Sequence, residues 1–255
     1  MQVKKHIAPW LVCTAVFLPS ACDMKMPGDS SPERLAERAA DSGDFETAAA
    51  LYNQAFTLNP NDTDALVGLG RSYAGMGQYS RAEQTLVEAQ KRKPRDAQIL
   101  LDLGRTQLAA GKPEAALKNL DAAYKLKPND LQIITARGVV LDALSRHSEA
   151  QALYRQGLDI DPTDFALQSN LGLSYGLSGQ TTEGIRILRE LIRDPAASRK
   201  TRGNLALVYG LAGRERDARA TLEADLTAEQ INSNLAYYAE LRTLLKQGQP
   251  IGALQ

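Results

Sequence analysis

The sequence predicts an all-α protein built as a solenoid, in which about six similar helix pairs stack in a row and one last helix covers the end. Residues that shape helices recur every 34 positions along most of the chain. The recurring columns are Pro60, Pro94, Pro128 and Pro162; Gly70, Gly104, Gly138 and Gly172; and Ala48, Ala82, Ala116 and Ala150. Several independent columns with one period indicate a repeat protein whose units bury their apolar faces against one another.

Before the repeats, residues 1–21 are predicted to be a lipoprotein-type signal peptide. Lys4 and Lys5 give a basic start, and residues 7–18 form an uncharged, mostly apolar run. Such a run is too short to cross a bilayer, which takes about 20 residues of helix, and it suits the apolar core of a secretory signal. A buried N-terminal helix is the alternative, but the run is not amphipathic and Pro9 interrupts it.

The end of this segment, residues 18–22, resembles the lipobox of bacterial lipoproteins. There, small residues precede a cysteine that receives a lipid and becomes the new N-terminus. Ser20 and Ala21 fit the pattern, whereas Pro19 stands where the family usually has leucine. The resemblance implies that Cys22 is lipidated and that residues 22–31 are the lipid anchor and a polar tether. The alternative is an exported protein with one free thiol, which an oxidising compartment disfavours.

The repeats divide into the units 29–62, 63–96, 97–130, 131–164, 165–198 and 199–232. We expect each unit to hold two amphipathic helices, A and B. Helix A should end at a residue in the left-handed conformation, which glycine adopts easily. That position holds Gly43, Gly77, Gly111, Ser145, Gly179 and Gly213. The late proline stops helix B, and the next helix should be capped by Asp62, Asp96, Asp130 or Asp164.

The columns resemble the tetratricopeptide repeat (TPR), most clearly in the second unit. The residues that carry the resemblance there are Leu66, Leu69, Gly70, Tyr73, Ala82, Leu86, Ala89 and Pro94. The early tryptophan of the family is absent, and the fifth and sixth units depart from the pattern near their ends. The resemblance implies a right-handed α-solenoid. With its capping helix this domain is predicted to span 32–247.

After the repeats, residues 231–247 are predicted to form the capping helix. Leu235, Tyr238, Leu241 and Leu245 recur at helical spacing and should face the last repeat. Residues 248–255 are predicted to be a flexible tail.

The TPR pattern places defined positions of helix A on the concave face of the solenoid. The predicted partner-binding groove consists of Asp64, Val67, Arg71, Gln98, Leu101, Arg105, Leu108, Gln132, Thr135, Val139, Asn170, Leu173, Leu177, Asn204, Leu207 and Leu211. The N-terminal end of the groove thus contains polar and apolar residues, whereas its C-terminal end is mainly apolar. Exposed apolar surface of this kind marks partner sites, where a helix or an extended segment can lie.

Three features of the groove have an alternative interpretation. For the leucines, the alternative is packing on the next unit or on the capping helix. Arg71 and Arg105 either bind a carboxylate of the partner or pair with Asp64 and Asp102. Asn170 and Asn204 occupy the same place in consecutive units, which resembles the asparagine columns that hold a peptide backbone in some TPR proteins; ordinary polar residues are the alternative.

Composition and motifs predict a binding protein without enzymatic activity. Basic and acidic residues are equal at 30 each, which disfavours a nucleic-acid binder. Two histidines and two cysteines are too few for a histidine-based metal site or a disulfide framework. We found no catalytic constellation, metal site, cofactor motif or small-molecule substrate site, and we expect His147 to be an exposed turn residue.

Short stretches of the sequence indicate a more specific family. Residues 199–213 (RKTRGNLALVYGLAG) and 234–238 (NLAYY) resemble the TadD lipoproteins of the tight-adherence (Flp) pilus system, and residues 104–108 and 137–142 are similar as well. The resemblance implies a role in pilus assembly and secretion, pilotin-like toward the secretin or its neighbours. It also implies a lipid anchor facing the periplasm in the outer membrane, although Asp23 after the lipid cysteine resembles an inner-membrane retention signal of enteric bacteria.

Two other functions remain open. The chain could be a TPR adaptor lipoprotein of another envelope system, such as polysaccharide export or outer-membrane protein assembly. A cytoplasmic TPR cochaperone is a weaker third interpretation.

Overall fold

The computed structural model describes residues 31–194 and 197–247, and within them the chain forms thirteen helices and no strand. The helices are α1 (Pro32–Asp41), α2 (Phe45–Leu58), α3 (Thr63–Gly75), α4 (Tyr79–Arg92), α5 (Ala97–Ala109), α6 (Pro113–Leu126), α7 (Leu131–Ala143), α8 (His147–Ile160), α9 (Phe165–Leu177), α10 (Thr181–Leu191), α11 (Arg199–Leu211), α12 (Glu215–Leu222) and α13 (Ala228–Lys246). Six helix pairs and one additional helix confirm the predicted all-α solenoid.

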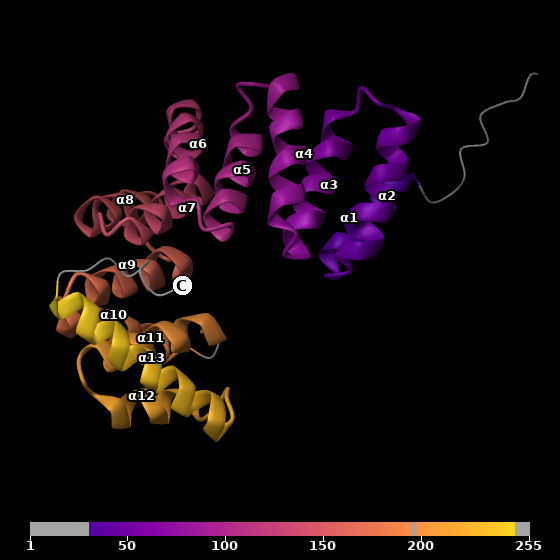
Figure 1. The fold of residues 1–255 in the computed structure, drawn as a ribbon. Coiled ribbons are helices and arrows are strands. Elements are labelled where there is room, and N and C mark those ends of the chain that lie inside the picture. Colours follow the sequence, from indigo (N-terminus) through magenta and orange to yellow (C-terminus); the bar gives the residue numbers. More distant parts are fainter. Residues whose placement is uncertain (1–30, 195–196, 248–255) are drawn as a thin grey trace, which may run out of the picture.

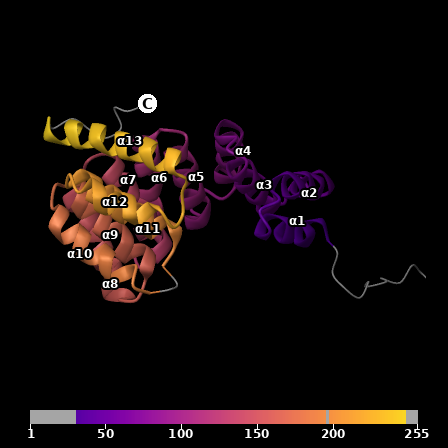
Figure 2. The ribbon, with the colours of Figure 1, turned by 90° about the horizontal axis from the view of Figure 1, so that it is seen from below.

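The helices follow one another along an arc, with α1 at one end and α13 at the other (Figures 1 and 2). Each helix packs against the next, and the odd-numbered A helices of neighbouring units also adjoin one another. The core is therefore a chain of small clusters, each placed between neighbouring units. One joins Leu86 of α4 to Leu103 of α5, and another joins Tyr154 of α8 to Leu167 of α9. No single unit could bury its apolar face alone.

The turn between helices A and B is set by one residue with positive φ. Glycine fills this place in five units, with φ between 72° and 83°. In the fourth unit Ser145 adopts the same conformation with φ 59°, so the geometry persists without glycine. A second glycine column allows the two helices of a pair to approach closely. At Gly104, for example, a Cβ atom would lie 2.6 Å from Cγ of Leu120.

Side-chain caps start most A helices, as predicted. The carboxylate of Asp62 accepts hydrogen bonds from two backbone N–H groups of α3, and Asp96 and Asp130 do the same for α5 and α7. Asp164 accepts one such bond at α9. The capping helix α13 begins at Ala228, three residues before the predicted start, because Thr227 and Gln230 form a reciprocal capping box.

The repeat becomes less regular toward the C-terminus. Helices α2, α4, α6 and α8 each have 14 residues, whereas α10 has 11 and α12 has 8. A cavity of about 620 Å³ opens beside the short α10, between apolar side chains of α8, α9 and α10. Helix α13 then packs on α11 and α12. Of its predicted inward residues, Tyr238 and Leu241 are buried, while Leu235 and Leu245 are half-buried.

Several predicted segments lie outside the described residues. These are the signal peptide over 1–21, the lipidation site Cys22, the tether as far as residue 30, and the tail over 248–255. Among the described helices, none combines the length and the apolar character needed to cross a membrane.

Candidate functional site

The N-terminal part of the predicted groove contains a cavity of about 240 Å³ between α1, α3 and α5, which we call the acidic hollow. Its charged lining consists of Glu33, Glu37, Asp62, Asp64, Asp96 and Arg71. Tyr52 also lines it, and burial raises the pKa of this phenol above its ordinary value. Two of the carboxylates, Asp62 and Asp96, are already used as helix caps.

Polar pairs, one of them across a repeat boundary, occupy most of the predicted groove residues at this end. The Arg71 guanidinium contacts the Asp102 carboxylate at 2.6 Å, and the Gln98 amide donates to the same carboxylate at 3.2 Å. Asp64 pairs with Lys93 at 2.7 Å, and this hydrogen bond raises the pKa of the Lys93 ammonium. Arg71 thus pairs with Asp102, as one of the two interpretations predicted, and Asp64 has a different partner.

The second predicted arginine makes a weaker contact. Arg105 donates to the side-chain oxygen of Gln132 in the next unit at 3.4 Å, and Arg105 itself is exposed. Of the neighbouring predicted residues, Thr135 donates its hydroxyl to a carbonyl of its own helix, and Leu108 packs half-buried against the core between units three and four. Arg105 and Gln132 therefore bridge two units on the surface.

Some predicted groove residues belong to the core instead, which corrects the prediction for them. Leu101 is fully buried and Val67 is 7% exposed, because the fifth place of helix A packs inside the neighbouring core clusters. Leu211 is also 7% exposed. Leu207 is half-buried and packs against the C-terminal core cluster. For Leu207, the alternative interpretation of packing within the fold applies.

The middle of the groove brings three predicted apolar residues together. Val139 of α7 and Leu173 and Leu177 of α9 line a cavity of about 320 Å³, which we call the leucine hollow. Its complete lining is Val139, Asp142, Ala143, Tyr154, Asn170, Leu173, Leu177 and Lys200. The three apolar side chains are partly buried, and Leu173 also packs against the C-terminal core cluster. Their remaining exposed surface lines the cavity and is apolar.

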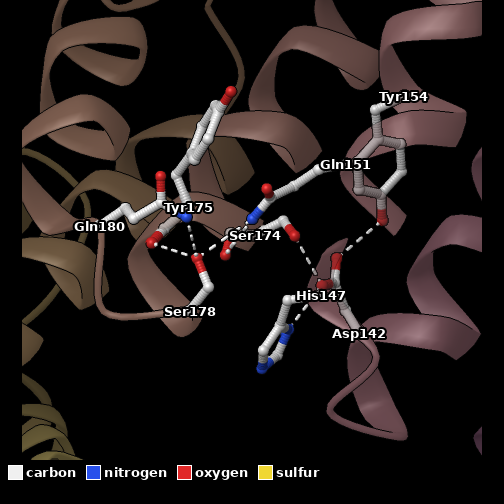
Figure 3. A network of polar contacts seen from close by, with 8 residues as sticks. All are labelled: Asp142, His147, Gln151, Tyr154, Ser174, Tyr175, Ser178 and Gln180. Atoms are coloured by element: carbon white, nitrogen blue, oxygen red, sulfur yellow. Dashed lines mark hydrogen bonds and ion pairs between the residues drawn. The ribbon is translucent and has the colours of Figure 1, made fainter. Parts of the chain in front are cut away.

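The buried carboxylate of Asp142 lines this hollow and is the acceptor in a network of polar contacts (Figure 3). Asp142 is 8% exposed and accepts hydrogen bonds from Tyr154 Oη at 3.0 Å and Ser174 Oγ at 2.7 Å. His147 Nδ1 lies 2.8 Å from the same carboxylate. Burial, together with the adjacent carboxylate, raises the pKa of the Tyr154 phenol well above its ordinary range. The network links α7, α8 and α9 and so fixes the fourth unit against the fifth.

The prediction for His147 was wrong, because this residue is the first of α8 and its side chain is only 12% exposed. The sequence did contain a signal for the network. Tyr154 stands in a 34-residue column where Leu86, Leu120 and Leu188 are its counterparts. A hydroxyl in a buried leucine column requires a partner, and an acidic residue twelve positions earlier supplies it.

The network has no nucleophile activated by a base. The Ser174 hydroxyl donates to Asp142 rather than to His147, so no serine–histidine pair forms. Within residues 31–194 and 197–247, no group of three or more histidine, cysteine, aspartate or glutamate side chains is arranged to hold a metal ion. The polar residues of this network tie α7, α8 and α9 together.

Next to the leucine hollow lies a cavity of about 190 Å³, which we call the serine hollow. Its lining is Phe165, Ala166, Ser169, Asn170, Ser198, Lys200 and Thr201, so it shares Asn170 and Lys200 with the leucine hollow. The two predicted asparagines differ here. Asn204 donates to Ser169 Oγ at 3.0 Å, whereas the Asn170 side chain has no hydrogen-bond partner in the described part of the chain. The two asparagines therefore do not act as one column.

Three family models match the sequence, each described as a tetratricopeptide repeat. They cover residues 39–105, 101–165 and 200–224, which together make up more than half of the chain. No curated protein matches the sequence.

Solved structures show the same fold at low sequence identity. A thermophilic TPR protein from Thermus thermophilus has a TM-score of 0.60 and 23% identity, with 69% of this chain and 96% of that chain covered. A TPR protein from Parabacteroides merdae has a TM-score of 0.66 and 19% identity, with 88% of each chain covered. YrrB, described as a TPR protein with an unusual peptide-binding site, has a TM-score of 0.51 and 22% identity over 64% of this chain and 84% of its own.

Proposed function

The chain belongs to the tetratricopeptide repeat family, and we propose that it is a membrane-anchored scaffold that holds a protein partner in its concave groove on the periplasmic side of a bacterial envelope. Solenoids of this family are protein–protein interaction scaffolds. The observation that supports the groove as the contact surface is the leucine hollow, which Leu173 and Leu177 line with partly exposed side chains beside a buried polar network. Apolar side chains left open to solvent in a concave surface favour a protein ligand.

The named system in this proposal is the tight-adherence (Flp) pilus. The resemblance of residues 199–213 and 234–238 to TadD lipoproteins supports it. The partner is then a component of the pilus secretion apparatus, such as the secretin, whose assembly the scaffold assists in a pilotin-like way.

The anchor in this proposal is a lipid on Cys22, in the outer membrane rather than the inner. Two acyl chains or more are needed for stable retention in a bilayer, so loss of the lipidated thiol should release the protein. Cys22→Ser is expected to move the chain into the soluble fraction and to reduce piliation. Cys13→Ser, inside the predicted signal peptide, is the matched control and should leave the protein membrane-bound. Membrane-bound Cys22→Ser protein would contradict the anchor.

The groove is tested by placing a photo-crosslinking amino acid at Leu177 in cells and identifying the captured protein by mass spectrometry. We expect a component of the pilus secretion machine, and we expect no such capture from position 118, because Lys118 is exposed on a B helix away from the hollows. Leu177→Glu, made with the crosslinker at Val139, should abolish capture because it places a charge in the apolar cavity. Unchanged capture would exclude the groove.

The identity of the crosslinked protein also decides between the pilus and the alternative. A component of polysaccharide export or of outer-membrane protein assembly would reassign the chain to that envelope system. The scaffold function itself would then stand while the pilus role would fall.

A further inference from the structure

Asn170 is a buried amide that the fold leaves without a partner. It is 5% exposed, and its side chain makes no hydrogen bond within the described residues. Its polar atoms retain contact with two cavities, because Asn170 lines both the leucine hollow and the serine hollow. No fully buried side-chain nitrogen or oxygen atom in the described residues lacks a partner, so the unbonded amide atoms of Asn170 are those that reach these cavities. There a ligand can bond them. Its position in the wall shared by two cavities indicates a binding site for a polar group.

Lys200 adds a free positive charge at the same place. This exposed residue also lines both hollows, and it makes no ion pair or hydrogen bond in the part of the chain that the structure describes. It lies in the first turn of α11, which contains no acidic residue. The neighbouring Arg199 and Arg202 both pair with Asp225, so Lys200 supplies the unpaired charge at this place. Helix N-termini favour negative charge, and here Lys200 reinforces that preference. The serine hollow therefore favours a carboxylate.

The leucine hollow has the opposite preference. Val139, Leu173 and Leu177 offer apolar surface, and Asp142 already places a carboxylate in its wall. Because the hydrogen bonds to Asp142 come from Tyr154 and Ser174 of the protein itself, a ligand has no need to supply a donor to it. A second carboxylate would be repelled there, whereas a large aliphatic side chain would bury its surface. The two hollows thus dictate the orientation of a ligand.

The spacing of the hollows sets the spacing of the groups that they bind. Their residues on α9 are centred roughly six positions apart, which at 1.5 Å per residue is about 9 Å. An extended peptide covers that distance in about three residues. We propose that the two hollows together bind an extended segment of a partner protein that carries a large aliphatic residue and, about three residues away, an aspartate or glutamate. The aliphatic side chain enters the leucine hollow, the carboxylate pairs with Lys200, and Asn170 bonds the peptide backbone between them.

This inference rests on the proposed scaffold function and specifies the chemistry of its partner. The test selects binders to the purified mature chain from a displayed library of random dodecapeptides. We expect enrichment of peptides with a leucine, isoleucine or methionine two to four residues from an acidic residue. The consensus peptide should lose about tenfold in affinity with Lys200→Glu, as expected for one charge-assisted contact. It should lose a similar factor with Asn170→Ala, whose folding is checked by its thermal midpoint.

Lys118→Glu is the matched control, because it makes the same charge change on an exposed lysine of α6 and should leave affinity unchanged. A repeated selection on Lys200→Glu should replace the acidic residue with a basic one. Since Lys200 is exposed, this variant tests the proposal without threatening the fold.

Four results would overturn the inference. The first is a selected consensus that lacks an acidic residue, and the second is an equal loss of peptide affinity in Lys200→Glu and Lys118→Glu. The third is peptide binding that appears only after residues 248–255 are deleted. The fourth is peptide binding that decreases as the protein concentration, and with it self-association of the chain, increases. The third would identify the chain's own C-terminal segment as the occupant, and the fourth a second copy of the chain. Crosslinking of a partner at Leu177 in cells would remain possible in the first two cases, so the scaffold function could survive the failure of this inference.

Discussion

The two halves of the groove use the same repeat positions in opposite ways. In the N-terminal half, the ninth place of the second unit holds Arg71, which pairs with Asp102 across the unit boundary. In the C-terminal half, the ninth place of the fifth unit holds Leu173, which faces an open cavity. The second place holds Asp64, paired with Lys93, at one end and the unpaired Lys200 at the other. Of these groove residues, Arg71 and Asp64 in the first half are paired within the fold, whereas Lys200 in the second half has no partner in the described part of the chain.

This difference shows that the repeat pattern determines where a side chain lies. The side chains around it determine whether it is paired within the fold or open to solvent. Each N-terminal pair has an exposed member: Arg71 is 50% exposed beside the buried Asp102, and Asp64 is 84% exposed beside Lys93. Ion pairs with an exposed member contribute little to stability. The C-terminal polar network around Asp142 is buried, and there each lost bond leaves an unsatisfied donor. Stability should therefore depend more on the buried network around Asp142 than on the ion pairs of the N-terminal half.

The sharpest test of this contrast compares two aspartates. Asp142→Ala should lower the free energy of unfolding by about 3 kcal/mol, because the Tyr154 and Ser174 hydroxyls and the His147 ring lose their acceptor inside the protein. Asp102 is as buried as Asp142, at 7% against 8% exposed, but Asp102→Ala should cost only about 1 kcal/mol, because its partner Arg71 is half-exposed and can turn to solvent. Urea unfolding followed by circular dichroism measures both, and equal losses would contradict the contrast.

A somewhat smaller effect is expected from glycine-to-alanine changes inside two A helices. Gly104→Ala should cost about 2 kcal/mol, because the new Cβ would lie 2.6 Å from Cγ of Leu120 and force that side chain to move. Gly203→Ala in α11 should instead gain up to about 1 kcal/mol, because nothing lies within 4 Å of its Cβ and alanine favours the helix. If Gly104→Ala and Gly203→Ala shift the thermal midpoint in the same direction, the spacing between neighbouring helices differs from that in the structure.

The turn of the fourth unit provides a third test. Ser145 has φ 59° where the other units have glycine, so Ser145→Gly should stabilise the chain by about 1 kcal/mol. The reverse change in the N-terminal half, Gly111→Ser, should destabilise it by a similar amount, since Gly111 has φ 73°. Paired denaturation curves give both values. A loss of stability in Ser145→Gly would indicate that the serine side chain has a role beyond the turn.

The smallest expected effect concerns pH and the surface pairs of the N-terminal half. The hydrogen bond from Lys112, and then that from Gln107, hold the pKa of Glu83 below its ordinary value of 4.5. A lowered pKa in the folded state means that this contribution is present above about pH 4.5 and is lost as the pH falls through the folded-state value. Glu83→Gln should therefore cost less than about 1 kcal/mol at pH 6 and almost nothing at pH 3. A cost that persists at pH 3 would show that the shape of the Glu83 side chain, and not its charge, contributes to stability.

Much of the fold could be read from the sequence because a repeat multiplies each local signal. Six copies of one glycine position and four copies of one aspartate cap predicted the turns and helix starts, including Ser145 as the exception. Where the copies diverge, prediction weakened. The early start of α13 depends on the pair Thr227 and Gln230, which occurs once, and the shorter α10 departs from the period.

The groove was less predictable for a different reason. The period assigns Leu101 to the concave face, yet neighbouring A helices bury it completely. The same period treats Asn170 and Asn204 alike, yet Ser169 lies close enough to bond only the second. Whether a side chain is exposed or paired depends on side chains from adjacent units, and a single-sequence pattern does not contain those distances.

The sequence by itself thus determined the architecture of the repeats, because helix period, turn residues and caps are local properties that recur. Only the tertiary structure decided which polar residues are paired within the fold and which remain free to contact a ligand. Asp142, His147 and Tyr154 meet through packing between units, and Asn170 and Lys200 remain without partners for the same reason. Hydrogen bonding between units is short-ranged in space but long-ranged in sequence, so the geometry of the stack had to be known first.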